Sequence, residues 1–272
     1  MFRPVNFVIT FISGILAVLI AQGGVYSDTV LYYGILVGIA AALVGAGGNI
    51  INDILDVETD KINRPDRPIP SGKVSETTAM RIYIFVKIGG IFFASIAGIF
   101  PGIIAAFSSI IIFFYSYSLK NIPLVGNITV AFFTGLIFVF GASAVGNFSG
   151  ILFPFLFSFF INFIREIVKD VEDIEGDRET EVHTFPIVFG IETSKKIITG
   201  LIFSLTVLTF IPFFLAVYKI EYLIIIALSV SPGLVTCAKA IKKAEIKEDY
   251  SKISKNLKLI MALGIVAILF GL

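Results

Sequence analysis

Residues 49–75 read NIINDILDVETDKINRPDRPIPSGKVS, and they begin where a nearly uncharged apolar run at residues 30–51 ends. An apolar run of that length is typical of a membrane span. The chain therefore places a dense group of aspartates, arginines and prolines directly after a span. This arrangement guides the interpretation of the remaining sequence.

The composition indicates an integral membrane protein. Of the 272 residues, 57% are hydrophobic and 15% are charged, and the mean hydropathy is +0.96, values outside the range of soluble domains. The apolar runs are continuous and do not alternate with polar residues, so the predicted fold class is all-α, a single polytopic membrane domain over residues 1–272. Nine transmembrane helices are predicted, at residues 5–22, 30–51, 81–99, 102–118, 124–146, 150–168, 197–217, 221–238 and 257–272.

The distribution of positive charge predicts the orientation in the cell membrane. With the N-terminus in the cytoplasm, every lysine and arginine except Lys219 falls on the cytoplasmic side. Arg3 precedes an apolar run without a cleavage site, so the first span is expected to remain uncleaved. The C-terminus is then external, and no nucleic-acid partner is expected from a net charge of +1. The predicted cytoplasmic segments are residues 52–80, 119–123, 169–196 and 239–256.

Two acidic motifs with the same spacing follow the second and sixth predicted spans. In each motif, three aspartates are separated by three and then four positions, which places them on one face of a helix. The recurrence on one side of the membrane suggests a parallel internal repeat, with its motifs at residues 49–72 and 162–177. The two faces comprise Asn49, Asp53, Asp56 and Asp60, and Asn162, Glu166, Asp170, Asp173 and Asp177.

Carboxylates clustered in this way predict a site for a hard divalent cation. Oxygen ligands favour Mg²⁺ or Ca²⁺, and the lone His183 and lone Cys237 cannot build a zinc site or an internal disulfide. Mg²⁺ normally combines one or two carboxylates with phosphate oxygens, so a phosphorylated ligand is expected. The cations expected to bind its phosphate are Arg64, Arg67, Lys120, Arg165 and Lys169, with Lys73 and Lys87 in addition.

Several other features have a simpler structural interpretation. The charges from Lys239 to Lys258 are typical of solvated helix ends, and His183 of an interfacial histidine. Gly45, Gly47 and Gly48 favour close helix packing over phosphate binding, and the prolines at 65, 68 and 70 favour a rigid loop. A cation transporter remains an alternative, but its charges are expected near the middle of the membrane and not at the ends of spans.

The first motif resembles that of the UbiA-type intramembrane prenyltransferases. The resemblance is carried by N52-D53-x-x-D56-x-x-x-D60-x-x-N63-R64-P65-x-R67-P68-x-P70-S71-G72 with D170-x-x-D173-x-x-x-D177 downstream, and it extends over the whole chain. It implies nine helices around a central cavity open to the cytoplasm, in which Mg²⁺ binds the diphosphate of a polyprenyl donor.

The resemblance and the two acidic faces together assign roles to individual residues. Catalytic roles are expected for Asp53, Asp56, Asp170, Asp173 and Lys120, and metal-site roles for Asn49, Asp53, Asp56, Asp60, Asp170, Asp173 and Asp177. Diphosphate or substrate contacts are expected for Asn49, Arg64, Arg67, Lys120, Arg165 and Lys169. The family often shows Tyr-x-x-x-Lys after the fourth span. Here Ser116 stands at the tyrosine position, so Tyr115 and Tyr117 are both candidates to approach the allylic carbon.

The acceptor is the least determined part of the expectation. Members of the family act on hydroxybenzoates, naphthoates, chlorophyllides, haem or a glyceryl lipid. The residues of the first motif, and a composition with 28 Phe and no Trp, are similar to those of archaeal members of the family. The predicted reaction is therefore geranylgeranyl transfer from geranylgeranyl diphosphate to geranylgeranylglyceryl phosphate in ether-lipid biosynthesis, with an aromatic acceptor as the alternative.

Overall fold

The computed structural model describes residues 3–179 and 183–272, without the side chains of residues 62 and 63. Within these ranges the chain is helical and contains no strand, as predicted. Residues 180–182 of the predicted cytoplasmic segment 169–196, and the side chain of motif residue Asn63, lie outside the description. The α-helices of the N-terminal half are α1 (Pro4–Ala21), α2 (Asp28–Leu55), α3 (Val57–Asn63), α4 (Glu76–Ala97), α5 (Ile99–Tyr117) and α6 (Val125–Val145), with the 3₁₀ turn η1 (Leu119–Asn121) before α6.

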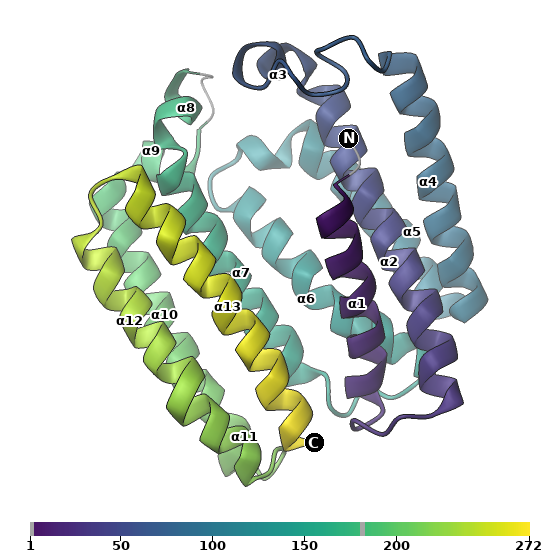
Figure 1. The fold of residues 1–272 in the computed structure, drawn as a ribbon, viewed down its shortest axis with the longest axis vertical. Coiled ribbons are helices and arrows are strands. Elements are labelled where there is room, and N and C mark those ends of the chain that lie inside the picture. The colour runs from purple at the N-terminus through teal and green to yellow at the C-terminus, as the bar shows by residue number, and fades with distance from the viewer. Residues whose placement is uncertain (1–2, 180–182) are drawn as a thin grey trace. The chain divides into compact units, whose positions relative to one another are not determined.

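The described C-terminal half contains two short helices and four long helical stretches. They are α7 (Leu152–Glu172), α8 (Ile174–Glu179), α9 (Phe185–Phe189), α10 (Ile191–Phe214), the continuous run α11 (Ile220–Ile225), π-helical η2 (Ile226–Val230) and α12 (Ser231–Lys243), and α13 (Lys247–Gly271). Figure 1 shows these elements along the chain.

Eight of the described helices are long and apolar enough to cross a membrane. They correspond to eight of the nine predicted spans, with α11, η2 and α12 forming one continuous span over Ile220–Lys243. The remaining prediction, residues 150–168, forms α7, but charged residues in its last two turns exclude it from the apolar set. The protein is therefore an all-helical, multi-pass membrane protein.

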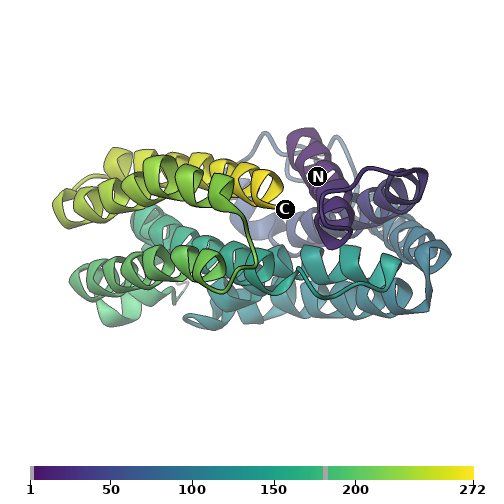
Figure 2. The ribbon, with the colours of Figure 1, turned by 90° about the horizontal axis from the view of Figure 1, so that it is seen from below.

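The chain divides into two compact units. Unit 1 comprises Met1–Lys120 and Ile137–Ser149, and unit 2 comprises Asn121–Leu136 and Gly150–Leu272. In unit 1, α2 is the central helix and packs against α1, α4 and α5. In unit 2, α13 packs against α7 and α12, and α10 packs against α7 and α12. The adjacent courses of α12 and α13 are visible in both Figure 1 and Figure 2.

Small residues allow the helices of unit 1 to approach closely. A Cβ added at Gly14 of α1 would lie 2.6 Å from the Cα of Gly38 in α2. Among the three glycines predicted to serve packing, Gly48 fits this role best, because an added Cβ would lie 2.8 Å from Ile112. Gly45 and Gly47 have only ordinary contacts, at 4.0 and 3.9 Å. The packing role of the glycine run thus rests mainly on Gly48.

Local capping explains where the helices that flank the first motif begin. The Ser27 hydroxyl accepts a hydrogen bond from the Val30 amide at the start of α2, and the Ser75 hydroxyl does the same for Thr78 at the start of α4. Asp28 and Glu76 follow in the first turns, where a negative charge is favourable.

Candidate active site

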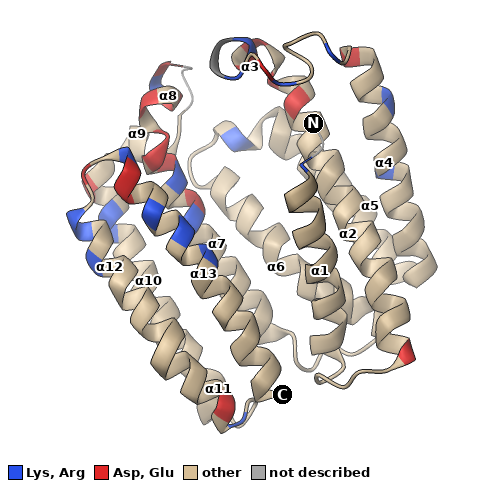
Figure 3. Ribbon diagram, viewed as in Figure 1, with Lys and Arg blue, Asp and Glu red and all other residues tan. Residues whose placement is uncertain are grey.

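Charged residues gather at one end of the helices in each unit. In unit 1 this end carries α3, η1 and the start of α4, and in unit 2 it carries α8, the end of α7 and the start of α13 (Figure 3). Charges in the described residues at the opposite ends are confined to Asp28, Lys219 and Glu221. Both acidic motifs belong to the charged ends, as their sequence positions predicted.

The first motif lies where α2 ends and α3 begins. Asp53 is in the last turn of α2, Asp56 separates the two helices, and Asp60 lies in α3. The side chains of Asp53 and Asp60 are only 3% and 8% exposed, whereas that of Asp56 is 25% exposed. Two of the three aspartates of the first motif are thus buried carboxylates, which require nearby positive charge.

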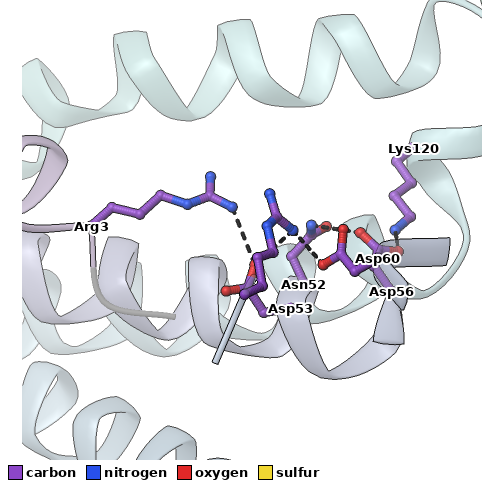
Figure 4. Close-up of polar contacts among 7 residues, drawn as sticks. Arg3, Asn52, Asp53, Asp56, Asp60 and Lys120 are labelled. Carbon is purple, nitrogen blue, oxygen red and sulfur yellow. Dashed lines mark hydrogen bonds and ion pairs between the residues drawn. The ribbon is translucent and has the colours of Figure 1, made fainter. Parts of the chain in front are cut away.

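Arg67 supplies positive charge to both buried carboxylates. Its Nη1 lies 3.2 Å from Asp53 Oδ1 and 2.5 Å from Asp60 Oδ2. A second guanidinium reaches the same Asp53 oxygen, because Arg3 Nη2 donates to Oδ1 at 3.2 Å (Figure 4). Asp53 is therefore held by cations from two segments that are far apart in the sequence.

The proline-containing loop positions Arg67. The Arg67 amide donates to the carbonyl of Arg64 at 3.0 Å, and the Val74 amide donates to the carbonyl of Pro68 at 2.9 Å. Between these turns, Ile69 is buried and packs with Val57 and Ala79. Hydrogen-bonded turns and one apolar anchor thus order the loop that the prolines predicted to be rigid.

Asp56 has different partners from the other two carboxylates. Asn52 Nδ2 donates to Asp56 Oδ2 at 2.7 Å, and Lys120 Nζ forms a short ion pair with Asp56 Oδ1. Lys120 comes from η1, 64 positions away along the chain. The structure therefore brings together Asp53, Asp56, Asp60, Arg67 and Lys120 through ion pairs (Figure 4).

Four other predicted residues also lie in unit 1. Arg64 is exposed, and Asn49 is half-buried on α2. Tyr117 is 64% exposed, and its ring stacks on Phe113 at a centroid distance of 6.2 Å. Tyr115 is half-buried, while the intervening Ser116 is 2% exposed. The choice between the two tyrosines for contact with the allylic carbon stays a prediction.

The second motif occupies the corresponding position at the end of α7. The buried Asn162 donates from Nδ2 to the carbonyl of Ser158 at 2.8 Å. One turn later, Glu166 accepts from Arg165 at 2.8 Å and from Lys169 at 3.3 Å. Glu166 is thus the shared partner of two residues that were predicted to bind substrate.

Asp170 and Asp177 lie beyond the predicted span 150–168 and have perturbed acidities. Burial raises the pKa of Asp170 to about 7, even though Asn127 Nδ2 donates to its Oδ2 at 2.7 Å. Nearby Glu166 and Asp177 also raise the Asp170 pKa. Burial raises the pKa of Asp177 as well, and the nearby carboxylate of Asp173 raises it further. A cation bound here would favour the ionised forms.

Unit 2 also contains a group of three cations, here named the basic cluster: Arg165, Lys169 and Lys258. Lys258, on α13, lies within electrostatic range of both α7 residues, and α7 and α13 pack together. The Nε of Arg165 is buried without a hydrogen-bond partner among the described residues. The basic cluster can accept an anion.

Asp173, the last of the candidate metal ligands, is about half exposed, and Lys247 Nζ lies 3.7 Å from its Oδ1.

The described residues contain no group of three or more His, Cys, Asp or Glu side chains arranged to hold a metal ion. In the first motif the carboxylates instead face Arg3, Arg67 and Lys120. Their oxygens nevertheless match the preference of Mg²⁺, and the cationic side chains are suited to phosphate. The residues present therefore fit a phosphate ligand bound together with a hard metal ion.

Sequence reasoning missed three residues of this arrangement. From the sequence, Arg3 has no expected ligand, Asn127 lies inside an apolar run, and Lys258 belongs to a segment typical of solvated helix ends. A polar amide within the predicted span 124–146 was the available signal for Asn127. The partners of Arg3 and Lys258 had no local signal, because their contacts come from distant segments.

Comparison with known proteins agrees with the geometry. The model of the UbiA prenyltransferase family matches residues 7–263. The chain belongs to the UbiA prenyltransferase family. Digeranylgeranylglyceryl phosphate synthase from Methanopyrus kandleri is 34% identical over 270 residues, covering 99% of this chain and 97% of that protein. The enzyme of the same name from Methanothermobacter thermautotrophicus is 34% identical over 269 residues, with coverages of 99% and 93%.

Solved structures extend the UbiA relationship to the fold. A structure of digeranylgeranylglyceryl phosphate synthase matches with a TM-score of 0.83 and 34% identity, covering 98% of this chain and 94% of that chain. A UbiA homologue from Archaeoglobus fulgidus, bound to GPP and Mg²⁺, matches with a TM-score of 0.74 at 20% identity, covering 96% of each chain. At that identity the second match supports the UbiA fold alone.

Proposed function

We propose that the protein transfers a geranylgeranyl group from geranylgeranyl diphosphate to the hydroxyl of geranylgeranylglyceryl phosphate, with Mg²⁺ as cofactor. The observation that carries this proposal is the 34% identity, over essentially the whole chain, to synthases of digeranylgeranylglyceryl phosphate. The two acidic motifs support it, because each provides oxygen ligands beside cationic side chains.

The first motif is suited to bind the donor diphosphate. When bound, Mg²⁺ would take up negative charge as the diphosphate leaves the allylic carbon. Arg64, Arg67 and Lys120 offer N–H donors to diphosphate oxygens, and Asp53, Asp56 and Asp60 offer carboxylate ligands for metal. In this proposal, substrate binding replaces the contact of Arg67 with Asp53 and that of Lys120 with Asp56, while Arg67 keeps its contact with Asp60.

The transfer itself breaks one bond and forms another. The allylic carbon–oxygen bond of the donor breaks, and its electron pair leaves with diphosphate. The acceptor oxygen then forms an ether bond to the allylic carbon, and its proton passes to the released diphosphate or to a motif carboxylate. The apolar helices limit access of water, which would otherwise consume the cationic prenyl group.

The basic cluster is suited to the phosphate of the acceptor. Arg165 and Lys169 both pair with Glu166, and Lys258 lies within electrostatic range of these three side chains, so the three cations outnumber the carboxylate with which two of them pair. A hydroxybenzoate or naphthoate carries less charge and requires fewer cations. This surplus favours a glyceryl phosphate over the aromatic alternatives.

The membrane arrangement within this proposal has residues 150–168, mostly in α7, as the ninth span and the N-terminus in the cytoplasm. Its support is the gathering of Lys and Arg at one end of the helices in each unit (Figure 3). The C-terminus would then be external. A central cavity open to the cytoplasm, the parallel repeat and a single catalytic domain over 1–272 stay predictions.

The direct test is diphosphate release by the purified protein with geranylgeranyl diphosphate and Mg²⁺. Release should require geranylgeranylglyceryl phosphate and yield the diether product by mass spectrometry. A hydroxybenzoate and a naphthoate are tested in parallel. Efficient prenylation of either one, with geranylgeranylglyceryl phosphate unreacted, would overturn the proposed acceptor.

A second assay tests the basic cluster. Lys258→Gln should lower kcat/KM on the order of tenfold for geranylgeranylglyceryl phosphate but little for the dephosphorylated alcohol, since a lost charge-assisted contact is worth about 1.5–3 kcal/mol. Lys255→Gln, an exposed position on the same helix, is the matched control. Equal losses with both acceptors would contradict a phosphate contact.

A further inference from the structure

Arg3 and Arg67 contact the same carboxylate oxygen in unit 1. Their guanidinium nitrogens each lie 3.2 Å from Asp53 Oδ1. Arg3 stands immediately before α1, whereas Asp53 lies in the last turn of α2, so the contact joins segments 50 positions apart. Figure 4 shows the Arg3 side chain extending toward Asp53.

The two arginines differ in how firmly they are held. Arg67 also contacts Asp60 at 2.5 Å, and its side chain is 18% exposed. Its backbone belongs to the loop anchored by Ile69. The Arg3 side chain is 40% exposed and lies at the N-terminal end of α1. Arg67 can therefore retain Asp60 if Asp53 gains another partner, while Arg3 is the cation better placed to move.

A divalent ion at Asp53 would compete with this arrangement. Two guanidinium groups beside a metal-bound oxygen would repel the added positive charge. An incoming diphosphate brings several anionic oxygens to the same place, and a planar guanidinium can bind two of them at once. Arg3 is long enough and exposed enough to exchange one anionic partner for the other.

We propose that Arg3 is a donor-binding residue that pairs with Asp53 in the empty protein and transfers to the donor diphosphate when metal and donor bind. The inference rests on the proposed function, since it takes the prenyl diphosphate and Mg²⁺ as ligands. It adds a residue from the N-terminal end of the chain to the donor site. Arg3 acts by direct contact with diphosphate and as a competitor of the metal.

This dual role predicts effects of opposite sign on two ligands. Arg3→Gln should bind Mg²⁺ alone more tightly, by about threefold, because a partly exposed competing charge is removed. The same variant should bind inorganic diphosphate, in the presence of saturating Mg²⁺, more weakly by on the order of tenfold. If Arg3 only anchored the N-terminus, its replacement would not change the Mg²⁺ affinity and the diphosphate affinity in opposite directions.

Both affinities can be measured without turnover. Mg²⁺ is titrated against the thermal unfolding midpoint of detergent-purified protein, and inorganic diphosphate is titrated calorimetrically at saturating Mg²⁺. Arg3→Lys retains the charge but not the planar fork, so it should keep the wild-type Mg²⁺ response and lose part of the diphosphate affinity. Arg81→Gln, at an exposed position in α4, is the control for removal of an arginine.

The outcomes separate this inference from the proposed function. Unchanged Mg²⁺ and diphosphate affinities in Arg3→Gln would overturn the inference, as would lower thermal stability with unchanged affinities. If Arg3→Gln does not fold, unaltered diphosphate binding in Arg3→Lys would overturn it. Failure of the wild-type protein to prenylate geranylgeranylglyceryl phosphate would refute the function instead, whatever the Arg3 variants bind.

Discussion

Replacement of Arg67 by glutamine tests how the first motif is stabilised in the absence of metal. The substitution removes a guanidinium that is 18% exposed and contacts carboxylates that are only 3% and 8% exposed. Removing one partner of a buried ion pair typically costs about 3–5 kcal/mol of folding free energy. Arg3 still pairs with Asp53, so the main uncompensated charge is Asp60, and about 3 kcal/mol is expected.

The measurement is unfolding of detergent-purified protein followed by circular dichroism in chelator. Arg64→Gln is the control, because Arg64 is an exposed arginine of the same loop. Adding Asp60→Asn to the Arg67 variant should recover more than half of the loss, since the uncompensated charge is then removed. Equal stability of the Arg67 and Arg64 variants in chelator would refute this account of the motif.

Four further outcomes are expected. Activity should disappear on chelation and return with Mg²⁺; recovery with zinc alone would contradict a site made of oxygen ligands. Asp53→Ala and Asp170→Ala should each abolish turnover, with the double variant little worse than either, whereas additive losses would argue for independent steps. Without metal, the Asp170 pKa is raised to about 7. The stability that this shift adds is fully present below about pH 4 and is lost as the pH rises through 7. Asp170→Asn should therefore make the thermal unfolding midpoint less dependent on pH over this range. His183→Ala should retain most activity, because this histidine is exposed; loss of turnover with normal folding would assign it a catalytic role.

Much of the fold was predictable because apolar length is a direct physical requirement of a bilayer. Helix boundaries were less predictable. The last span was expected from residue 257, but α13 begins at Lys247, since charged residues can continue a helix beyond the hydrocarbon. The π-helical turn Ile226–Val230 also had no periodic signal. It precedes Pro232, whose missing N–H disturbs regular α-helical hydrogen bonding.

The candidate site was predictable only in part. Spacings of three and four residues predict Asp53, Asp56 and Asp60 on one helix face, but the helix ends before Asp56 and Asp60 lies in α3. The structure nevertheless brings cations to all three. The partners of the motif aspartates were harder to predict, because the pairs Arg3–Asp53 and Asn127–Asp170 join residues that are 50 and 43 positions apart in the sequence. Such pairs depend on how the helices pack, which local periodicity does not specify.

The position of Asp56 and Asp173 at helix ends has a further electrostatic consequence. Asp56 immediately follows α2, and Asp173 immediately follows α7. The C-terminal end of a helix carries a partial negative charge from carbonyl groups without intrahelical partners. Each motif therefore places a carboxylate at the end of a helix dipole that disfavours it, although the N-terminus of the next helix, α3 or α8, offsets part of this effect. The negative potential that results attracts cations to each motif before any ligand contact forms.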